Sequence, residues 1–195
     1  MIESSLQYLP SEIEMANRTS RAFGAVGRRA IVPRIVREWI SDGDLVLDFG
    51  AGKSAIHAVQ LRREGYNVVA HEFGQNQRAG LHDSDALQNG AYDIVYASNV
   101  LNVQSSYRML QSTLMQIFIC LRFGGIFIGN YPRPRKMALF TPKQMGDLLT
   151  IQFGSKTMTV LPGRKLSSGR VPPSPVFIVT RRNIDTYSHF TNFVG

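Results

Sequence analysis

The chain has a single cysteine, Cys120, among its 195 residues, so no disulfide can form within it. Such sparse use of cysteine is typical of proteins of a reducing compartment. No apolar run approaches the roughly 18–20 residues that a membrane span needs. The first residues, Met1 to Ser4, are neither basic nor apolar, as a secretory signal would be. We therefore expect a cytoplasmic protein without a membrane-spanning segment.

Acidic residues are scarce in the last third of the chain. Residues 122–195 contain 11 Lys and Arg residues but only two acids, Asp147 and Asp185, whereas residues 1–121 hold 11 basic and 12 acidic residues. The net charge of +8 and the pI near 10.0 therefore come from the last third. This asymmetry favours a polyanion as partner. A basic face that only keeps the protein in solution is the equally open alternative.

Apolar runs and helical spacing alternate along most of the chain. Short apolar runs predict strands at 45–47, 67–70, 92–97, 126–128, 157–161 and 176–180. Apolar residues at helical spacing predict helices over 28–40, over 54–64, from Ser105 to the Gly124-Gly125 pair, and over 141–154. The alternation indicates an α/β fold in three layers, with a mostly parallel sheet covered on both faces. The last two strands have no helix between them and should form a C-terminal antiparallel hairpin.

The length suits one domain with a core of its own. With 44% hydrophobic residues, the chain is not a disordered polyelectrolyte. We expect an N-terminal arm at 1–26, one α/β domain over 27–182 and a C-terminal tail at 183–195.

The most informative stretch is LDFGAGKS, from Leu47 to Ser54, where a predicted strand runs into a Gly-rich turn and then a helix. Glycines let the backbone approach a ligand, and the first N–H groups of a helix lack partners within it. Glu72 closes the next predicted strand 20 residues after Gly52. This is the spacing at which a carboxylate receives the hydroxyls of a ribose.

Two other nucleotide-binding motifs resemble this turn in part. A P-loop needs a glycine where Leu47 stands, so we exclude it. Gly50, Gly52 and Ala55 do satisfy the dinucleotide pattern G-x-G-x-x-G/A. Asp48 argues against a dinucleotide, because an acid beside the turn would repel a pyrophosphate and attract an α-ammonium group. The chain also leaves no room for a separate substrate domain.

Four segments resemble, in the same order, the motifs of the class I S-adenosylmethionine-dependent methyltransferases: Val46–Gly52, Val68–Glu72, Tyr92–Val95 and Gly124–Phe127. The similarity covers about residues 28–182. It implies a Rossmann-like methyltransferase sandwich whose sheet has seven strands, the last inserted antiparallel. It also implies S-adenosyl-L-methionine as cofactor.

The resemblance further implies a set of cofactor contacts: Asp48, Gly50, Ala51, Gly52, Glu72, Phe73, Asp83, Ser98 and Asn99. Asp48 would lie near the amino group of the cofactor, Glu72 would bind its ribose, and Asp83 or Asp85 would meet its adenine. An ordinary polar turn at 82–85 is the alternative for the last two acids. Only 11 residues separate Glu72 from Asp83, too few for the family's usual helix and third strand, so this segment should be abbreviated.

No residue is singled out as catalytic. Methyl transfer from a sulfonium mainly requires alignment of nucleophile, methyl group and sulfur, and it needs a base only when the nucleophile arrives protonated. The Asp/Asn/Ser-Pro-Pro-aromatic motif of amino-methylating DNA enzymes is missing at Ser98-Asn99, which disfavours methylation of an exocyclic base amine. We expect Asn99 to contact the methyl donor or a substrate. The alternative is that Asn99 caps a helix before Val103. No cluster of ligands predicts a metal site.

Basic residues follow predicted strands at the edge where open α/β sheets bind ligands. The candidate substrate contacts are Tyr131, Arg133, Arg135, Lys136, Arg164, Lys165 and Arg170. A packing role is the alternative for Tyr131, and Arg181 and Arg182 should lie at the far edge.

The sequence thus predicts an S-adenosylmethionine-dependent methyltransferase that acts on a nucleic acid or another polyanion. One alternative is a small-molecule methyltransferase. Another is a catalytically inactive protein that keeps the fold as a structural or nucleic-acid-binding subunit. Binding of the methyl donor would separate the enzymes from the inactive protein.

Overall fold

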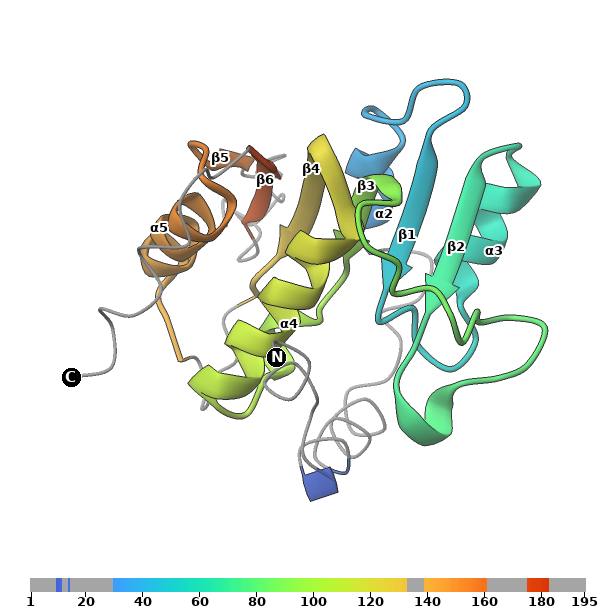
Figure 1. Cartoon of the computed structure of the whole chain (residues 1–195), viewed down its shortest axis with the longest axis horizontal. Helices are drawn as coiled ribbons and strands as arrows, with labels where there is room; N and C mark the ends of the chain where they lie inside the picture. The colour runs from blue at the N-terminus through green and yellow to red at the C-terminus, as the bar shows by residue number, and fades with distance from the viewer. Residues whose placement is uncertain (1–9, 12–13, 15–29, 133–138, 161–174, 183–195) are drawn as a thin grey trace, which may run out of the picture.

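The computed structural model describes residues 10–11, 14, 30–132, 139–160 and 175–182. Its centre is a six-stranded sheet in the order β2-β1-β3-β4-β6-β5 (Figure 1). Strands β1 to β4 are parallel, and β6 runs antiparallel to both β4 and β5. The strands are β1 (Leu45–Phe49), β2 (Asn67–His71), β3 (Tyr92–Ala97), β4 (Leu121–Asn130), β5 (Met158–Val160) and β6 (Val176–Thr180).

Helices cover both faces of the sheet. Val46 of β1 is buried against α2 and α3, whereas the next residue, Leu47, is buried with residues of α4 and α5. Successive strand side chains point to opposite faces, so a strand buried on both sides is apolar at nearly every position. The helices are α2 (Val32–Val36), α3 (Ile56–Arg63), α4 (Tyr107–Cys120) and α5 (Pro142–Phe153), with short 3-10 helices η3 (Gly74–Asn76) and η4 (Leu101–Val103).

The predicted α/β class, the mostly parallel sheet and the antiparallel C-terminal strands are confirmed. Helix α5 begins as expected, because Thr141 and Gln144 form a capping box, and it ends at Gly154 in the left-handed conformation (φ 67°). None of the helices among the described residues has the length and apolar character needed to cross a membrane.

Three helix ends differ from the prediction. Of the helix expected over 28–40, the described part is α-helical only at Val32–Val36. Helix α3 begins later than expected because Ala55 adopts a left-handed conformation (φ 42°). The cap of α4 is Ser106 rather than Ser105.

The Gly124-Gly125 pair does not end α4, contrary to the prediction. Helix α4 ends at Cys120 and the chain enters β4 at the next residue, so both glycines lie within the strand. A Cβ at Gly125 would meet the carbonyl oxygens of Arg122 and Tyr92 at 2.9 and 3.0 Å. Gly125 therefore permits the close approach of β3 and β4, whose pairing shifts register here.

The segment between β2 and β3 is abbreviated, as predicted, and holds η3 and turns. The N–H of Asp83 donates to the carbonyl oxygen of Ala70 at 2.9 Å. This single bond lies at the outer edge of β2, where a further strand would pair. The described residues therefore form a sheet of six strands, one fewer than the seven that the resemblance implies.

Candidate functional site

The carboxyl ends of the parallel strands meet at one edge of the sheet, where ligands bind in open α/β folds. The glycine turn follows β1, Glu72 follows β2, Ser98 follows β3, and β4 ends at Asn130. Antiparallel β6 begins at this edge, because Val176 pairs with Asn130 and also with Val160, the last residue of β5. Residues 161–175 thus connect two strand ends at the same edge.

The glycine turn is tied to β2 and has one crowded and one open glycine. Gly50 and Gly52 adopt φ values of +74° and +73°, which L side chains rarely adopt. The N–H groups of Gly50 and Ala51 donate to the carbonyl oxygen of His71 at 3.0 and 2.8 Å. A Cβ at Gly50 would lie 2.7 Å from Val100 Cγ2, whereas a Cβ at Gly52 would meet no described atom within 4 Å. The lack of a side chain at Gly50 lets the turn pack against Val100, whereas Gly52 borders open space.

Glu72 lies beside Gly52, as the spacing predicts. Its Oε2 accepts a hydrogen bond from the N–H of Gly52 at 2.5 Å, and its Oε1 accepts one from the N–H of Phe73 at 2.7 Å. Burial raises the pKa of Glu72, and the two amide donors oppose this shift. Each carboxylate oxygen has a second lone pair, so Glu72 can still accept from a ligand hydroxyl.

Asp48 is a buried acid rather than an exposed charge beside the turn. It lies on the face of β1 that α2 and α3 cover, in register with Tyr96 of β3. Its exposed fraction is 2%, and burial raises its pKa to about 7, although the Tyr96 hydroxyl and the Ala58 amide oppose the shift. Asp48 Oδ2 has no hydrogen-bond partner among the described residues.

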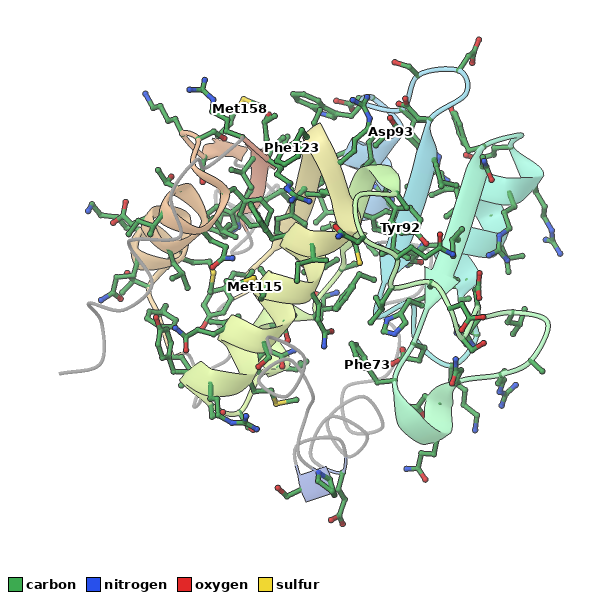
Figure 2. All side chains as sticks on the ribbon, viewed as in Figure 1. Phe73, Tyr92, Asp93, Met115, Phe123 and Met158 are labelled. Atoms are coloured by element: carbon green, nitrogen blue, oxygen red, sulfur yellow. The ribbon has the colours of Figure 1, made fainter. Side chains whose placement is uncertain are left out.

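Phe73 joins an aromatic cluster next to Glu72. Its ring lies 4.4 Å from that of His71 and 5.4 Å from that of Phe49, centre to centre and edge to face (Figure 2). Burial lowers the pKa of His71 to about 4, so this ring is neutral at pH 7. The cluster therefore places an apolar surface beside the Glu72 carboxylate.

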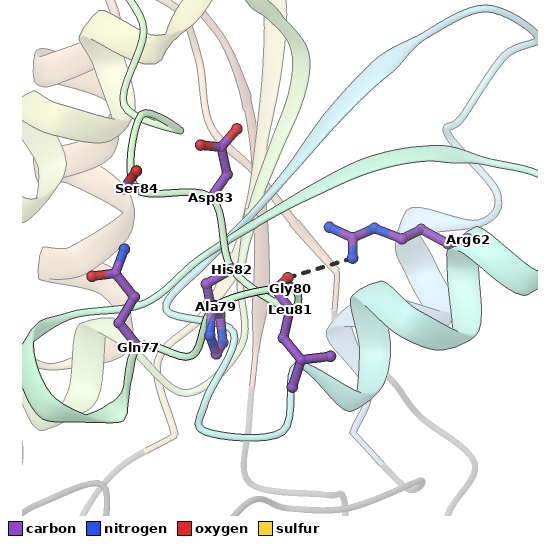
Figure 3. A pocket seen from close by; sticks show the side chains of 8 residues that line it. All are labelled: Arg62, Gln77, Ala79, Gly80, Leu81, His82, Asp83 and Ser84. Atoms are coloured by element: carbon purple, nitrogen blue, oxygen red, sulfur yellow. Dashed lines mark hydrogen bonds between the residues drawn. The ribbon is translucent and has the colours of Figure 1, made fainter.

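A cavity of about 640 Å³ lies between α3 and the turn that follows η3 (Figure 3). Arg62 forms one wall and donates from Nε to the carbonyl oxygen of Val68 at 2.6 Å. Asp83 lines the cavity, and its Oδ1 accepts from the N–H of Asp85 at 2.8 Å. Of the two acids considered for adenine, Asp83 is the one that borders this cavity.

His82 was not among the predicted site residues, yet it contacts the glycine turn directly. Its Nε2 lies 2.9 Å from the carbonyl oxygen of Gly52, and its Nδ1 accepts from the N–H of Arg78 at 2.9 Å. The only sequence signal was the polar HDSD stretch, which does not distinguish this contact from an ordinary turn.

Asn99 links the ends of two central strands. Its N–H donates to Asn130 Oδ1 at 2.6 Å, and Asn130 Nδ2 donates back to Asn99 Oδ1 at 2.9 Å. Asn99 has a left-handed backbone (φ 60°), and the neighbouring Ser98 is half-buried. The 3-10 helix η4 has Val100 at its N-cap position without a side-chain cap, so the helix-cap alternative for Asn99 is wrong.

Tyr131 lies in the core and not on a basic rim, which corrects its predicted placement. Its exposed fraction is 1%, and its hydroxyl accepts from the N–H of Phe140 at 3.2 Å. The other predicted substrate contacts lie outside the described residues: Arg133, Arg135, Lys136, Arg164, Lys165 and Arg170. Arg181 lies at the opposite edge of the sheet, as predicted, and donates to the carbonyl oxygen of Phe118 at 2.9 Å. The described part of the chain contains no group of three or more His, Cys, Asp or Glu that could hold a metal ion.

Several solved structures share this fold. The 1,6-didemethyltoxoflavin-N1-methyltransferase of Burkholderia thailandensis is 16% identical, with a TM-score of 0.62 over 91% of this chain and 92% of that one. A TehB-like SAM-dependent methyltransferase from Corynebacterium glutamicum is 15% identical, with a TM-score of 0.57 over 89% of this chain and all of that one (100%). The CurJ carbon methyltransferase, also 15% identical with a TM-score of 0.57, is matched by 77% of this chain, which spans about half (53%) of its length.

No protein-family model matches the chain, and no curated protein matches its sequence. The structural likenesses, at 15–16% identity, establish the fold. The chain has the fold of the S-adenosylmethionine-dependent methyltransferases.

Proposed function

We propose that the protein is an S-adenosyl-L-methionine-dependent methyltransferase. The observation that carries the proposal is Gly52, a left-handed glycine beside open space whose N–H is bonded to the acid that follows the neighbouring strand. This arrangement lets a ligand approach the backbone next to a carboxylate that accepts hydroxyls. The shared fold supports the same proposal.

The described residues fit the methyl donor. Glu72 would accept the ribose hydroxyls with the lone pairs that Gly52 and Phe73 leave unused. Asp48, whose Oδ2 has no partner among the described residues, would in its ionised form favour a ligand with an α-ammonium group over one with a diphosphate. Phe73 would flank the nucleoside with an apolar ring.

The donor, when bound, supplies a methyl group that its sulfonium already activates. The task of the chain is then to hold the donor and the acceptor in line. The reciprocal hydrogen bonds between Asn99 and Asn130 keep the ends of β3 and β4 together at this edge. An acceptor whose nucleophilic atom carries no proton needs no general base.

For the acceptor we propose a nucleic acid or another polyanion. The support is the charge of residues 122–195, with 11 basic and two acidic residues. Three of these, Arg164, Lys165 and Arg170, belong to the connection between two strands that meet at the candidate edge. A small-molecule acceptor is the second candidate, favoured by the likeness to an enzyme solved with bound 1,6-didemethyltoxoflavin.

Transfer of a labelled methyl group from the donor tests the function and separates the two acceptors. The protein is incubated with labelled S-adenosyl-L-methionine and either cellular RNA and DNA or a protein-free extract of small molecules. Label in the nucleic acid supports the polyanion. Label only in the small-molecule fraction supports the second candidate, and donor binding without transfer to any fraction contradicts the proposed activity.

A further inference from the structure

His82 reaches the glycine turn from a segment that the sheet itself does not include. It lies in the connection between β2 and β3, and its ring points toward the loop that joins β1 to α3 (Figure 3). The exposed fraction of the residue is 8%, so the imidazole is largely removed from water. His82 and the neighbouring Leu81 and Asp83 line the cavity beside α3.

The partners of the two ring nitrogens determine the tautomer of His82. The backbone N–H of Arg78 can only donate, so Nδ1 accepts and carries no proton. In the neutral ring the proton is then on Nε2, which donates to the carbonyl oxygen of Gly52, a group that can only accept. The imidazole therefore bridges two backbone groups in a single orientation.

Gly52 is held from both sides by these contacts. Its N–H donates to Glu72 Oε2 at 2.5 Å, and its carbonyl oxygen accepts from His82 at 2.9 Å. Glycine has the widest backbone freedom of all residues, and no described atom lies within 4 Å of the place where a Cβ would be. The two hydrogen bonds thus orient the peptide groups on either side of Gly52.

We propose that His82 is a positioning residue for the methyl donor, a role that rests on the proposed methyltransferase function. By holding the Gly52 carbonyl, His82 keeps the turn in the conformation in which its backbone borders the donor and its N–H aligns the Glu72 carboxylate. The segment from Glu72 to Asp83 is too short for a long helix and a strand. Its compact turn instead brings a side chain to the glycine turn.

Substitution of His82 by Asn or by Gln tests its two hydrogen bonds one at a time. The oxygen of Asn lies near the position of Nδ1, and the NH₂ group of Gln lies near that of Nε2. His82→Asn therefore keeps the acceptor for Arg78 and loses the bond to Gly52, whereas His82→Gln keeps the donor to Gly52. We expect the affinity for S-adenosylhomocysteine to fall about tenfold in His82→Asn, and to stay within about threefold of wild type in His82→Gln.

Calorimetric titration with S-adenosylhomocysteine and the melting temperature of each variant provide the test. Gln88→Ala, an exposed position in the same connection, is the control and should bind like the wild type. The positioning role is wrong, while the proposed function stands, in either of two cases. In the first, the wild type binds and both His82 variants bind with its affinity. In the second, the affinities of both variants fall by the same factor. If the wild type does not bind, the proposed function and the role of His82 are both overturned.

Discussion

The protonation of Asp48 is coupled to folding. Its ordinary pKa of 3.8 rises to about 7 in the folded protein, because burial disfavours the carboxylate. Between these two values the folded state holds the proton that the unfolded state has lost. The free energy of unfolding therefore falls as the pH rises toward 7 and becomes independent of this group above it.

Replacing Asp48 with Asn removes this titration. We expect the free energy of unfolding of the wild type, relative to Asp48→Asn, to fall between pH 5 and pH 7 by up to about 1.4 kcal/mol per pH unit and then to level off. Urea denaturation at pH 5, 6, 7 and 8 measures the difference. The opposite contribution of His71, whose pKa is lowered to about 4, is common to both proteins and cancels. A difference that does not change with pH would mean that Asp48 is ionised in the folded protein.

The residues of the candidate site differ in how far the sequence could predict them. Glu72 could be placed beside Gly52 because both follow adjacent parallel strands, and register fixes the distance between strand ends. His82 could not, because its contact with Gly52 depends on the path of a turn without regular spacing. Tyr131 looks the same in sequence whether it binds a substrate or packs, and only its burial distinguishes the two.

The glycine turn offers a comparison of two positions with the same backbone and different surroundings. Gly50→Ala and Gly52→Ala both place an L side chain at a φ near +74°, which costs about 1 kcal/mol. Gly50→Ala also forces its methyl group against Val100, and we expect it to be the more destabilising by about 1–3 kcal/mol.

Urea denaturation of the two variants tests this difference. In a Val100→Ala background, which removes the crowding methyl groups, the two substitutions should cost nearly the same. An equal cost in the wild-type background would contradict the packing of Gly50 on Val100.

At the scale of elements, local patterns predicted the strands better than the ends of helices. Residues 92–97 and 176–180 form strands with the predicted bounds, because both runs are buried and rich in β-branched and aromatic residues. The prediction that the Gly124-Gly125 pair ends α4 was wrong because glycine occurs both at helix ends and where two strands approach closely. Only the neighbouring carbonyl groups of β3 show which applies.

At the scale of the whole molecule, the excess positive charge lies in residues 122–195. In that part, Arg181 donates to backbone carbonyl groups, and Lys143 is paired with Asp147 at 3.1 Å. The cations of 133–136 and 164–170 lie outside the described residues. The sequence alone shows the charge asymmetry. The edge of the sheet at which the connection before β6 ends follows from the antiparallel direction of β6, which starts at the candidate edge.

Simultaneous replacement of Arg164, Lys165 and Arg170 by Ala tests the polyanion. Fewer cations release fewer counterions, so the slope of log affinity against log salt for a single-stranded oligonucleotide should become shallower by about two units. The control replaces Lys156 and Arg182, exposed residues at the opposite edge of the sheet. In the control we expect a much smaller change of this slope for each charge removed. An unchanged slope in the triple variant would contradict a polyanion at this edge.

Calorimetric titration with S-adenosylhomocysteine, in the wild type and in Gly52→Val, tests the proposed binding site most directly. Valine at this position would occupy the open space beside the turn. The wild type should bind one ligand per chain, and Gly52→Val should fail to bind while it still unfolds cooperatively. Absence of binding by the wild type, equal affinity in the two proteins, or binding of NAD or ATP in its place would contradict the methyl-donor site.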